Sequence, residues 1–195
     1  MKKTVTLILS RTRGGGIILS KIIIGVHAGH SKKGIGEGAI GYIHESTYAR
    51  KIVHYVIKTL REYGYTVKNT TVDTGNQKEV LQGISKKSID CNYNISIHLN
   101  SGGGQGFETL VKKTTPKIKA LNDETATLFG LKNRGVKVRN DLYVLNKLNN
   151  CTIFECGFVD NLKDSAYVKN NYQYIGKIIA INYHEYLQKI RWKDW

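Results

Sequence analysis

The sequence predicts a three-layer α/β domain, in which a mostly parallel β-sheet lies between helices. Three observations favour this class. Apolar segments of strand length alternate with segments of helical periodicity, glycine-rich turns separate several of them, and no internal repeat is present. The 195 residues suit a single domain, and the chain's one proline, Pro116, excludes a proline-rich linker between two large domains.

The individual elements follow from the spacing of apolar residues. Residues 21–26 (KIIIGV) form a continuous, largely β-branched run, which is typical of a strand buried on both faces. Between Glu45 and Tyr63 the apolar residues recur at three- and four-residue steps, and Gly64 ends this pattern, so an amphipathic helix is expected. Further strands are expected at 65–69, 93–99, 107–111, 142–145 and 151–156, and further helices at 76–88, 115–131 and 172–190.

The two ends of the chain are expected to lie outside the domain. Residues 1–20 are predicted to be an extension, 21–190 the domain and 191–195 a short tail, because RTRGGG interrupts the pattern before the first strand. Arg11 and Arg13 cut off a short apolar run, and no typical cleavage site follows, so a signal peptide is not expected. No stretch approaches the roughly 20 apolar residues that a membrane-spanning helix needs.

The cysteines do not predict a disulfide framework. Cys91, Cys151 and Cys156 are an odd number and form no CxxC pair. Cys151 and Cys156 lie in one strand-like run, and an extended chain at about 3.3 Å per residue places them beyond the reach of a disulfide. We therefore expect buried or free thiols in a reducing compartment.

The charge balance limits the classes of partner. Lys and Arg number 30 and Asp and Glu 15, which gives a formal net charge of +15 and excludes an acidic or neutral surface. Nucleic acids and the anionic polymers of a cell envelope both attract such a chain. The run KNRGVKVR (132–139) and the terminal RWKDW are basic, yet no nucleic-acid recognition motif accompanies them. A solvated basic surface without a specific partner is the third interpretation.

Three predicted strands lead to residues that can bind a metal ion or a proton. KIIIGV is followed by HAGH, which ends at His30, YNISIHL carries His98 near its end, and CTIFE ends at Glu155. The carboxyl ends of parallel strands share one edge of a sheet, where ligands bind. Glu45 falls on the inward stripe of its helix, at the first turn, and would project towards the same edge.

Two imidazoles and one carboxylate, with a fourth position for water, suit a catalytic zinc ion. A further carboxylate, here Glu155, could accept a proton from the water. No local motif such as His-Glu-x-x-His is present, so the spacing by itself only suggests such a site. Structural alternatives stay open, because Glu45 could cap its own helix, His98 could be a hydrogen-bonded structural residue, and Glu37 is a rival carboxylate.

Taken in order, IIIGVHAGHS, NISIHLNS, GFETLV, NRGVKV and IFECGFVDN, with Glu45 between the first two, resemble the zinc-dependent N-acetylmuramoyl-L-alanine amidases of the amidase-3 type. This family includes bacterial autolysins and phage endolysins. The resemblance covers about residues 21–190, and SIHLN and ECGFVDN are its most specific parts. It implies a twisted, mixed but largely parallel sheet of about six strands with helices on both faces.

The resemblance also implies a reaction and a set of site residues. The reaction is hydrolysis of the amide between N-acetylmuramic acid and L-alanine in peptidoglycan, which lyses the cell wall. Glu155 would be the catalytic carboxylate that moves the proton of the attacking water. The residues that would bind one Zn²⁺ per chain are His30, Glu45 and His98. Those expected to line the groove or support the site are Asn100, Phe158 and Asn161.

The chain departs from the family's pattern around the first ligand. HAGH (27–30) stands where the family usually has Asp-Pro-Gly-His, which makes His27 a second candidate imidazole. His30 is preferred because a glycine precedes it, as in the motif. Ser31 and Lys32 replace the usual Gly-Gly, and the arginine often found in the helix before SIHLN has no clear counterpart. Other histidines expected to be structural or exposed are His44, His54 and His184.

Two further functions stay open. The chain could be a metal-free basic module that binds an envelope polymer or nucleic acid, or another zinc hydrolase with a different amide substrate. Because of the metal-binding pattern, we attribute the net charge to attraction by anionic cell-wall polymers, and no nucleic-acid partner is expected. Without a signal peptide, the protein is expected to stay in the cytoplasm until lysis and then to act on the wall.

Overall fold

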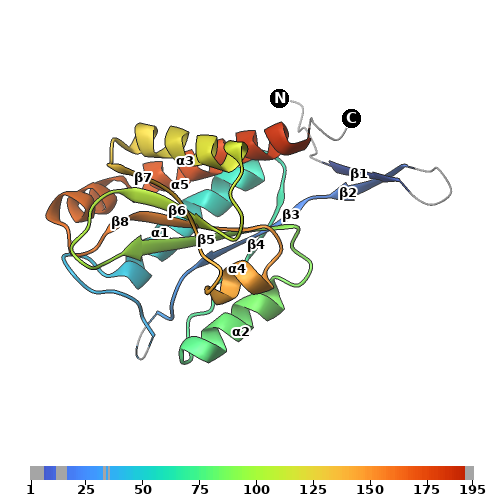
Figure 1. The fold of residues 1–195 in the computed structure, drawn as a ribbon. Helices are drawn as coiled ribbons and strands as arrows, with labels where there is room; N and C mark the ends of the chain where they lie inside the picture. The colour runs from blue at the N-terminus through green and yellow to red at the C-terminus, as the bar shows by residue number, and fades with distance from the viewer. Residues whose placement is uncertain (1–6, 12–16, 33, 35, 192–195) are drawn as a thin grey trace.

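The computed structural model describes residues 7–11, 17–32, 34 and 36–191. Strands β1 (Leu7–Arg11) and β2 (Ile17–Lys21) pair antiparallel in a small sheet, which projects from the rest of the molecule in Figure 1. The main sheet starts at Ile23. The predicted bounds of the extension (1–20) and the tail (191–195) stay predictions, because part of each segment lies outside the described residues.

The main sheet has six strands in the order β4-β3-β5-β8-β6-β7. The first four are mutually parallel, β6 runs antiparallel to β8, and β7 runs parallel to β6. The predicted mixed, largely parallel sheet is therefore confirmed. The strands are β3 (Ile23–Ala28), β4 (Thr66–Asn69), β5 (Tyr93–Asn100), β6 (Phe107–Val111), β7 (Asn133–Val138) and β8 (Cys151–Phe158).

Helices cover both faces of this sheet, which confirms the three layers. One face carries α1 (Glu45–Glu62), α3 (Pro116–Phe129) and α5 (Leu162–Arg191). The other carries two shorter helices, α2 (Gln77–Lys87) and α4 (Tyr143–Lys147), which lie below the sheet in Figure 1.

The main core lies between the sheet and the layer of long helices. Ile95, Ile97 and Phe154 are fully buried there, and they belong to one cluster with residues of the helices such as Ile52 and Tyr183. Full burial of a large apolar side chain contributes roughly 1.5–3 kcal/mol. Because side chains alternate along a strand, the residues between these core positions in β5 and β8 face the shorter helices instead.

Residues 142–145 do not form the strand that the sequence predicted. Tyr143 begins the short helix α4, and the backbone of Leu142 precedes it in an extended conformation. A short apolar run suits one turn of buried helix as well as a buried strand, so its pattern does not separate the two. In the structure Val144 and Leu145 pack with residues of α2 in a second, smaller core.

Strand β7 was missed because its sequence lacks an apolar pattern. The sequence indicates a basic run at 132–139 and a family motif, NRGVKV, but no strand, whereas Asn133–Val138 pairs with β6 at the edge of the sheet. Lysines and arginines are common in edge strands, because they oppose pairing with another chain.

Two elements begin or end at residues other than those predicted. The first strand of the main sheet is Ile23–Ala28 rather than 21–26, so His27 lies within it. The last helix begins at Leu162 rather than at 172. Its first turns are polar, and the signal for its start is Asn161, whose side chain accepts hydrogen bonds from the backbone N–H groups that follow.

All three cysteines are buried free thiols, as predicted. Burial raises the pKa of the Cys151 and Cys156 thiols, which keeps them protonated. Among the described residues, no helix combines the length and the apolar character that crossing a membrane requires.

Candidate metal centre

Two histidines and a glutamate from distant parts of the chain meet at the carboxyl edge of the sheet. His30 follows β3, Glu45 is the first residue of α1, and His98 lies near the end of β5. One potential ligand atom from each lies within 4.8 Å of the others. Oε1 of Glu45 is 3.0 Å from Nδ1 of His98 and 3.5 Å from Nε2 of His30. The three residues predicted as ligands are thus brought together, and this cluster could hold a metal ion.

Glu45 does not cap its own helix. Its Oε2 accepts a hydrogen bond from the backbone N–H of Ala39, and its Oε1 accepts one from that of Leu99. Both donors lie outside α1, and the side chain is only 3% exposed. A buried carboxylate needs such partners, because an unpaired one is costly. The structural alternative for Glu45 is therefore excluded, and its side chain is aimed at the two imidazoles.

The three groups of the cluster influence one another's protonation. Burial opposes the ionisation of Glu45, but the hydrogen bond to His98 and the charges of both histidines outweigh it, so the pKa of Glu45 is lowered. Burial also opposes a charged His98, yet its hydrogen bond to Glu45 and the nearby carboxylates raise the pKa of His98. Burial lowers the pKa of His30. An ionised carboxylate beside two imidazoles is a donor set that suits a divalent cation.

Two glycines make room for these side chains. A Cβ at Gly29 would lie 1.9 Å from Cε1 of the His98 ring, and a Cβ at Gly38 would lie 2.7 Å from Oε2 of Glu45. Gly38 also has a φ of +87°, which favours glycine. His30 itself has a φ of 64°, an unusual value for a residue with a side chain. The backbone around the first ligand is therefore shaped by the site.

Arg50 holds the loop that carries His30. Its Nη2 donates to the carbonyl oxygen of His30 at 3.1 Å, and its Nε donates to Oδ1 of Asp73 at 2.8 Å. Arg50 lies on α1, which also carries Glu45, so one helix supplies a residue of the cluster and positions the loop that carries His30. The apolar pattern of α1 does not reveal this role of Arg50. The feature that could have indicated it is the position of the arginine on the partly buried side of the helix, where a guanidinium needs hydrogen-bond acceptors.

The rival ligands lie outside the cluster. His27 is fully buried in β3, and burial lowers its pKa to about 3, so its ring is neutral. Its Nδ1 lies 3.4 Å from Oγ1 of Thr70. Glu37, in the loop after His30, is not part of the group of potential ligands. The structure therefore favours His30 over His27 and Glu45 over Glu37.

Glu155 occupies β8 at the position that pairs with His98 in the parallel register. On its other side it pairs with Glu108 of β6. Its Oε2 is buried without a hydrogen-bond partner among the described residues. Burial raises the pKa of Glu155 to about 7, and the charge of His98 opposes this shift only in part. A carboxyl group with a pKa near neutrality can both accept and donate a proton.

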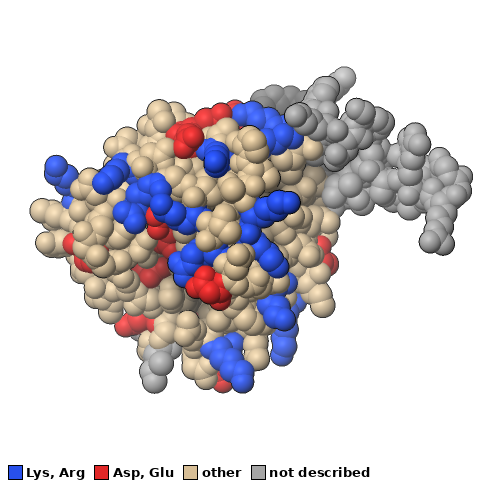
Figure 2. Space-filling view, viewed as in Figure 1, with Lys and Arg blue, Asp and Glu red and all other residues tan. Residues whose placement is uncertain are grey.

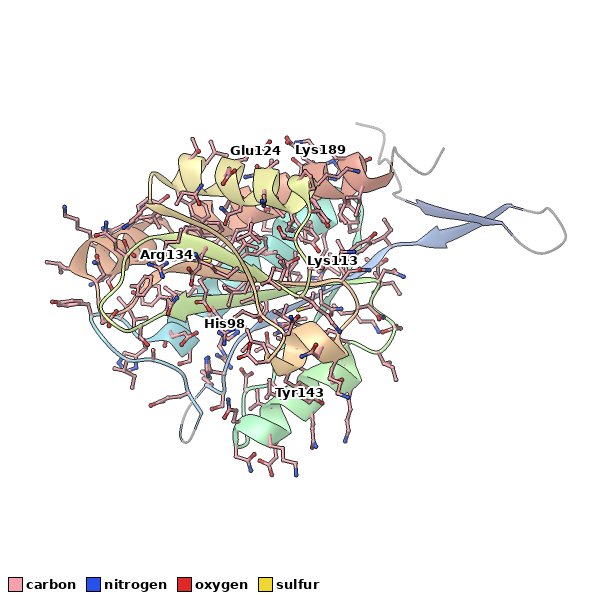
Figure 3. The ribbon with its side chains drawn as sticks, in the orientation of Figure 1. His98, Lys113, Glu124, Arg134, Tyr143 and Lys189 are labelled. Atoms are coloured by element: carbon pink, nitrogen blue, oxygen red, sulfur yellow. The ribbon has the colours of Figure 1, made fainter. Side chains whose placement is uncertain are left out.

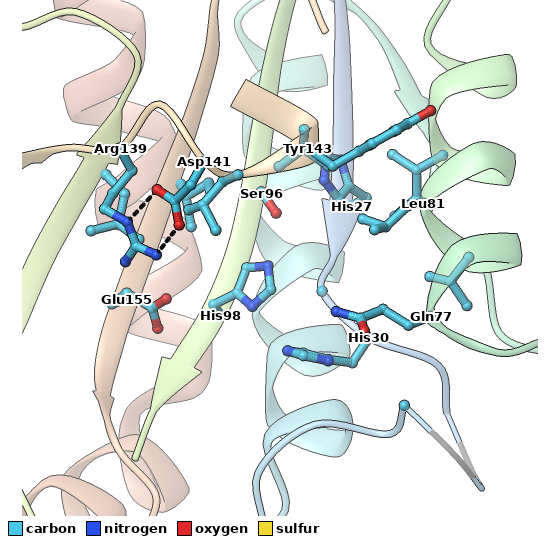
Figure 4. Close-up of a pocket in the computed structure, with 18 residues that line it drawn as sticks. His27, His30, Gln77, Leu81, Ser96, His98, Arg139, Asp141, Tyr143 and Glu155 are labelled. Atoms are coloured by element: carbon cyan, nitrogen blue, oxygen red, sulfur yellow. Dashed lines mark hydrogen bonds and ion pairs between the residues drawn. The ribbon is translucent and has the colours of Figure 1, made fainter. Parts of the chain in front are cut away.

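A pocket of about 410 Å³ joins Glu155 to the histidines of the cluster. Its floor is the face of the sheet that includes Ser96 and Ile153, and its walls come from α2, α4 and the loop before α4. Figure 4 shows His98 between His30 and Glu155. The volume lies within the roughly 300–1,000 Å³ of typical small-molecule sites.

The three predicted groove residues lie outside this pocket. Asn100 donates to Glu108, which also accepts from Arg134 at 2.8 Å. The guanidinium of Arg134 lies 4.9 Å from the ring centre of Phe158, which is 3% exposed. Asn161 caps α5, as described above. None of the three predicted residues, Asn100, Phe158 and Asn161, lines the pocket.

Two aspartates after β8 hold the glycine-rich loop SGGGQG beside the site. Oδ2 of Asp160 accepts from the backbone N–H groups of Gly102 and Gly103, at 2.7 and 2.8 Å. Oδ2 of Asp164 accepts from that of Gly106 at 2.7 Å. Local sequence patterns do not reveal this contact, because the residues are far apart in the chain.

The surface around β6 and β7 is basic. Figure 2 shows groups of Lys and Arg side chains over this face, and Figure 3 labels Lys113 and Arg134 on it. Exposed lysines of these strands and the adjoining turns are Lys112, Lys113, Lys132 and Lys137.

Fold and site together define an α/β domain with a potential metal centre at the carboxyl edge of its sheet. The profile of a family described as N-acetylmuramoyl-L-alanine amidase matches residues 24–182. The chain belongs to this family.

Solved structures and sequence relatives agree with this assignment. The catalytic domain of the CD27L endolysin, which targets Clostridium difficile, is 25% identical, with a TM-score of 0.72 over 83% of this chain and 96% of that chain. The catalytic domain of CwlV, an N-acetylmuramoyl-L-alanine amidase from Bacillus (Paenibacillus) polymyxa var. colistinus, is 25% identical, with a TM-score of 0.73 over 86% of this chain and 98% of that chain. An uncharacterised protein of Clostridium perfringens is 31% identical over 86% of this chain and 54% of its own length. The chain spans about half the length of such curated relatives.

Proposed function

We propose that this chain hydrolyses the amide between the lactyl group of N-acetylmuramic acid and L-alanine in bacterial peptidoglycan. The observation that carries the proposal is the pocket lined by Glu155 together with His98 and His30 of the cluster. Membership of the amidase family names the bond. The product would be a glycan strand freed of its peptide, which weakens the wall.

We assign one Zn²⁺ to the cluster, held by His30, Glu45 and His98. The donor chemistry fits, since zinc takes imidazole nitrogens and carboxylate oxygens and keeps one position open in catalytic sites. When bound, the ion would supply a Lewis acid for the carbonyl oxygen and lower the pKa of a water molecule. The ordered bonds of Glu45 to the N–H groups of Ala39 and Leu99 would keep its carboxylate in place.

Glu155 would move the proton. Its carboxylate would take a proton from the attacking water as the new C–O bond forms, and return it to the amide nitrogen as the C–N bond breaks. The leaving group is then a neutral amine at the amino terminus of L-alanine. The burial that raises the pKa of Glu155 to about 7 supports both halves of this exchange near neutral pH.

Other parts of the chain would support the reaction indirectly. Asn100 and Phe158 would hold the edge of the sheet beside Glu108 and Arg134, and Asn161 would fix the start of α5. The net charge of +15 would attract the chain to the anionic polymers of the wall, by an interaction that salt weakens.

The test measures metal content and wall hydrolysis on the same purified chain. We expect about one zinc per chain, clearing of isolated Gram-positive walls, and new amino termini on alanine. Chelation should stop clearing and added zinc should restore it. Clearing that exposes reducing sugar ends instead of alanine would point to a different bond. Wall binding without metal and without clearing would replace the amidase by a metal-free basic binding module.

A further inference from the structure

The pocket extends beyond the metal cluster to a fixed positive charge. Among the described residues that line it, Arg139 is the one arginine or lysine, and Asp141 is the residue that pairs with it. Figure 4 shows the guanidinium of Arg139 on the same side of the pocket as Glu155. Arg139 is not part of the metal cluster, and its charge opposes in part the rise in the pKa of Glu155.

Asp141 orients the guanidinium without using all of its donors. Nε and Nη2 of Arg139 donate to the two carboxylate oxygens of Asp141 at 2.8 and 2.7 Å. This pair occupies one edge of the planar fork, and five N–H donors are present in all. The remaining edge has no hydrogen-bond partner among the described residues, and the side chain is 43% exposed. Such an edge can bind a carboxylate with two parallel hydrogen bonds.

The ligand that suits Arg139 is the anionic group of the substrate nearest to the scissile bond. If the proposed function holds, one side of that bond is a sugar with hydroxyl and acetamido groups and no free acid. The other side is L-alanine followed by a D-glutamate residue, which is linked through its side chain and so carries a free α-carboxylate. Two residues of extended chain place this group roughly 7 Å from the bond.

The shape of the pocket favours the same assignment. The glycan is a long polymer that must pass the site in both directions, whereas the peptide stem branches away from it. The pocket is bounded by the sheet, α2 and α4, and its inner lining is apolar, with Val80, Ile84 and Ile153. A short branch can enter such a recess, and a continuous glycan strand cannot.

We infer that Arg139 is a specificity-determining residue, which binds the free α-carboxylate of the second stem residue and so favours stems with D-glutamate over stems with its amide, D-isoglutamine. This inference rests on the proposed function, because it places the peptide side of the scissile bond in the pocket. Charge-assisted hydrogen bonds of this kind correspond to a preference of about 10- to 100-fold.

The experiment compares two synthetic muropeptides that differ only in this carboxylate or amide. The ratio of their kcat/KM values is measured for the wild type, Arg139→Gln and Arg139→Lys. We expect the wild type to prefer the free acid, Arg139→Gln to bring the ratio close to one, and Arg139→Lys to keep part of the preference. Lys58→Gln removes a charge from the exposed side of α1 and should leave the ratio unchanged.

Direct binding separates failure of the inference from failure of the proposed function. Calorimetry measures the affinity of each protein for the dipeptides L-Ala–D-Glu and L-Ala–D-isoGln, each with its side-chain carboxyl group blocked as a methylamide as it is by the next residue of the stem. An equal ratio in wild type and Arg139→Gln, in hydrolysis or in binding, would overturn the role of Arg139 even if the amidase activity is present. A preference for L-Ala–D-Glu that needs Arg139, without hydrolysis of either muropeptide, would support the carboxylate site and reject the proposed reaction.

Discussion

His98 and Glu155 occupy paired positions on the neighbouring parallel strands β5 and β8. The pairing places an imidazole of the metal cluster and a carboxyl group with a raised pKa side by side on one face of the sheet. Because both residues lie on central strands, their separation is fixed by backbone hydrogen bonds rather than by a flexible loop. A reaction that needs a metal ion and a proton carrier at a constant separation can use this arrangement.

Replacing Glu155 by glutamine should remove the proton carrier and leave the cluster intact. We expect turnover of wall material to fall by roughly 10²- to 10⁴-fold, the usual loss for a general acid–base group. Zinc content, measured by atomic emission, should stay at the wild-type value. Loss of metal together with activity would assign Glu155 to the cluster instead.

Replacing His30 or His98 by alanine should abolish stoichiometric zinc binding, because each would supply one of three protein ligands. His27→Ala is the matched control, since His27 is an imidazole on β3 that lies outside the cluster. Equilibrium dialysis against zinc should show one bound ion for the wild type and for His27→Ala. Zinc loss in His27→Ala with retention in His30→Ala would exchange the roles of the two histidines.

A single methyl group at Gly29 should disturb the site as strongly as loss of a ligand. The added Cβ would lie 1.9 Å from the His98 ring, so the ring must move away from Glu45. Gly29→Ala is therefore expected to lower zinc affinity by at least the roughly 10- to 100-fold seen when support of a ligand is lost. Gly102→Ala adds backbone strain without a clash, because φ is +109° there and the Cβ meets open space, and it should keep wild-type affinity.

The contribution of Glu155 to the stability of the metal-free protein should fall as the pH rises from about 4.5 to about 7. The folded-state pKa of Glu155 is raised from 4.5 to about 7, so the folded state binds its proton more tightly than the unfolded chain does. Above this window the folded state holds the buried, unfavourable charge of Glu155, which lowers the contribution of this residue to the free energy of unfolding. Glu155→Gln should therefore raise that free energy at pH 8 by on the order of 3 kcal/mol, and should change it little at pH 4.

Denaturant unfolding at the two pH values, with the metal removed, measures this difference. Glu62→Gln, on the exposed side of α1, is the control and should shift stability equally at both pH values. Equal stabilisation by Glu155→Gln at pH 4 and pH 8 would show that the carboxyl group titrates normally in the fold.

Several features of the molecule followed from local sequence alone. The continuous apolar run of the first core strand, the amphipathic pattern from Glu45 onwards and the alternating order of elements determined the α/β class. The candidate metal ligands could also be predicted, because the carboxyl ends of the strands in such a sheet share one edge. The order of the motifs indicated the family. Local patterns failed at Tyr143–Lys147 and at Asn133–Val138, where a short apolar run and a charged edge strand carry no distinct periodicity.

The tertiary structure decided what depends on contacts between distant residues. It aimed the Glu45 carboxylate away from its own helix and towards His98, and it placed Arg50 against the loop of His30. It also turned Arg139 into the pocket beside Glu155. The first two outcomes rest on the burial of polar groups, which must find partners wherever the fold brings them. Periodicity along the chain, in contrast, records only which residues are apolar.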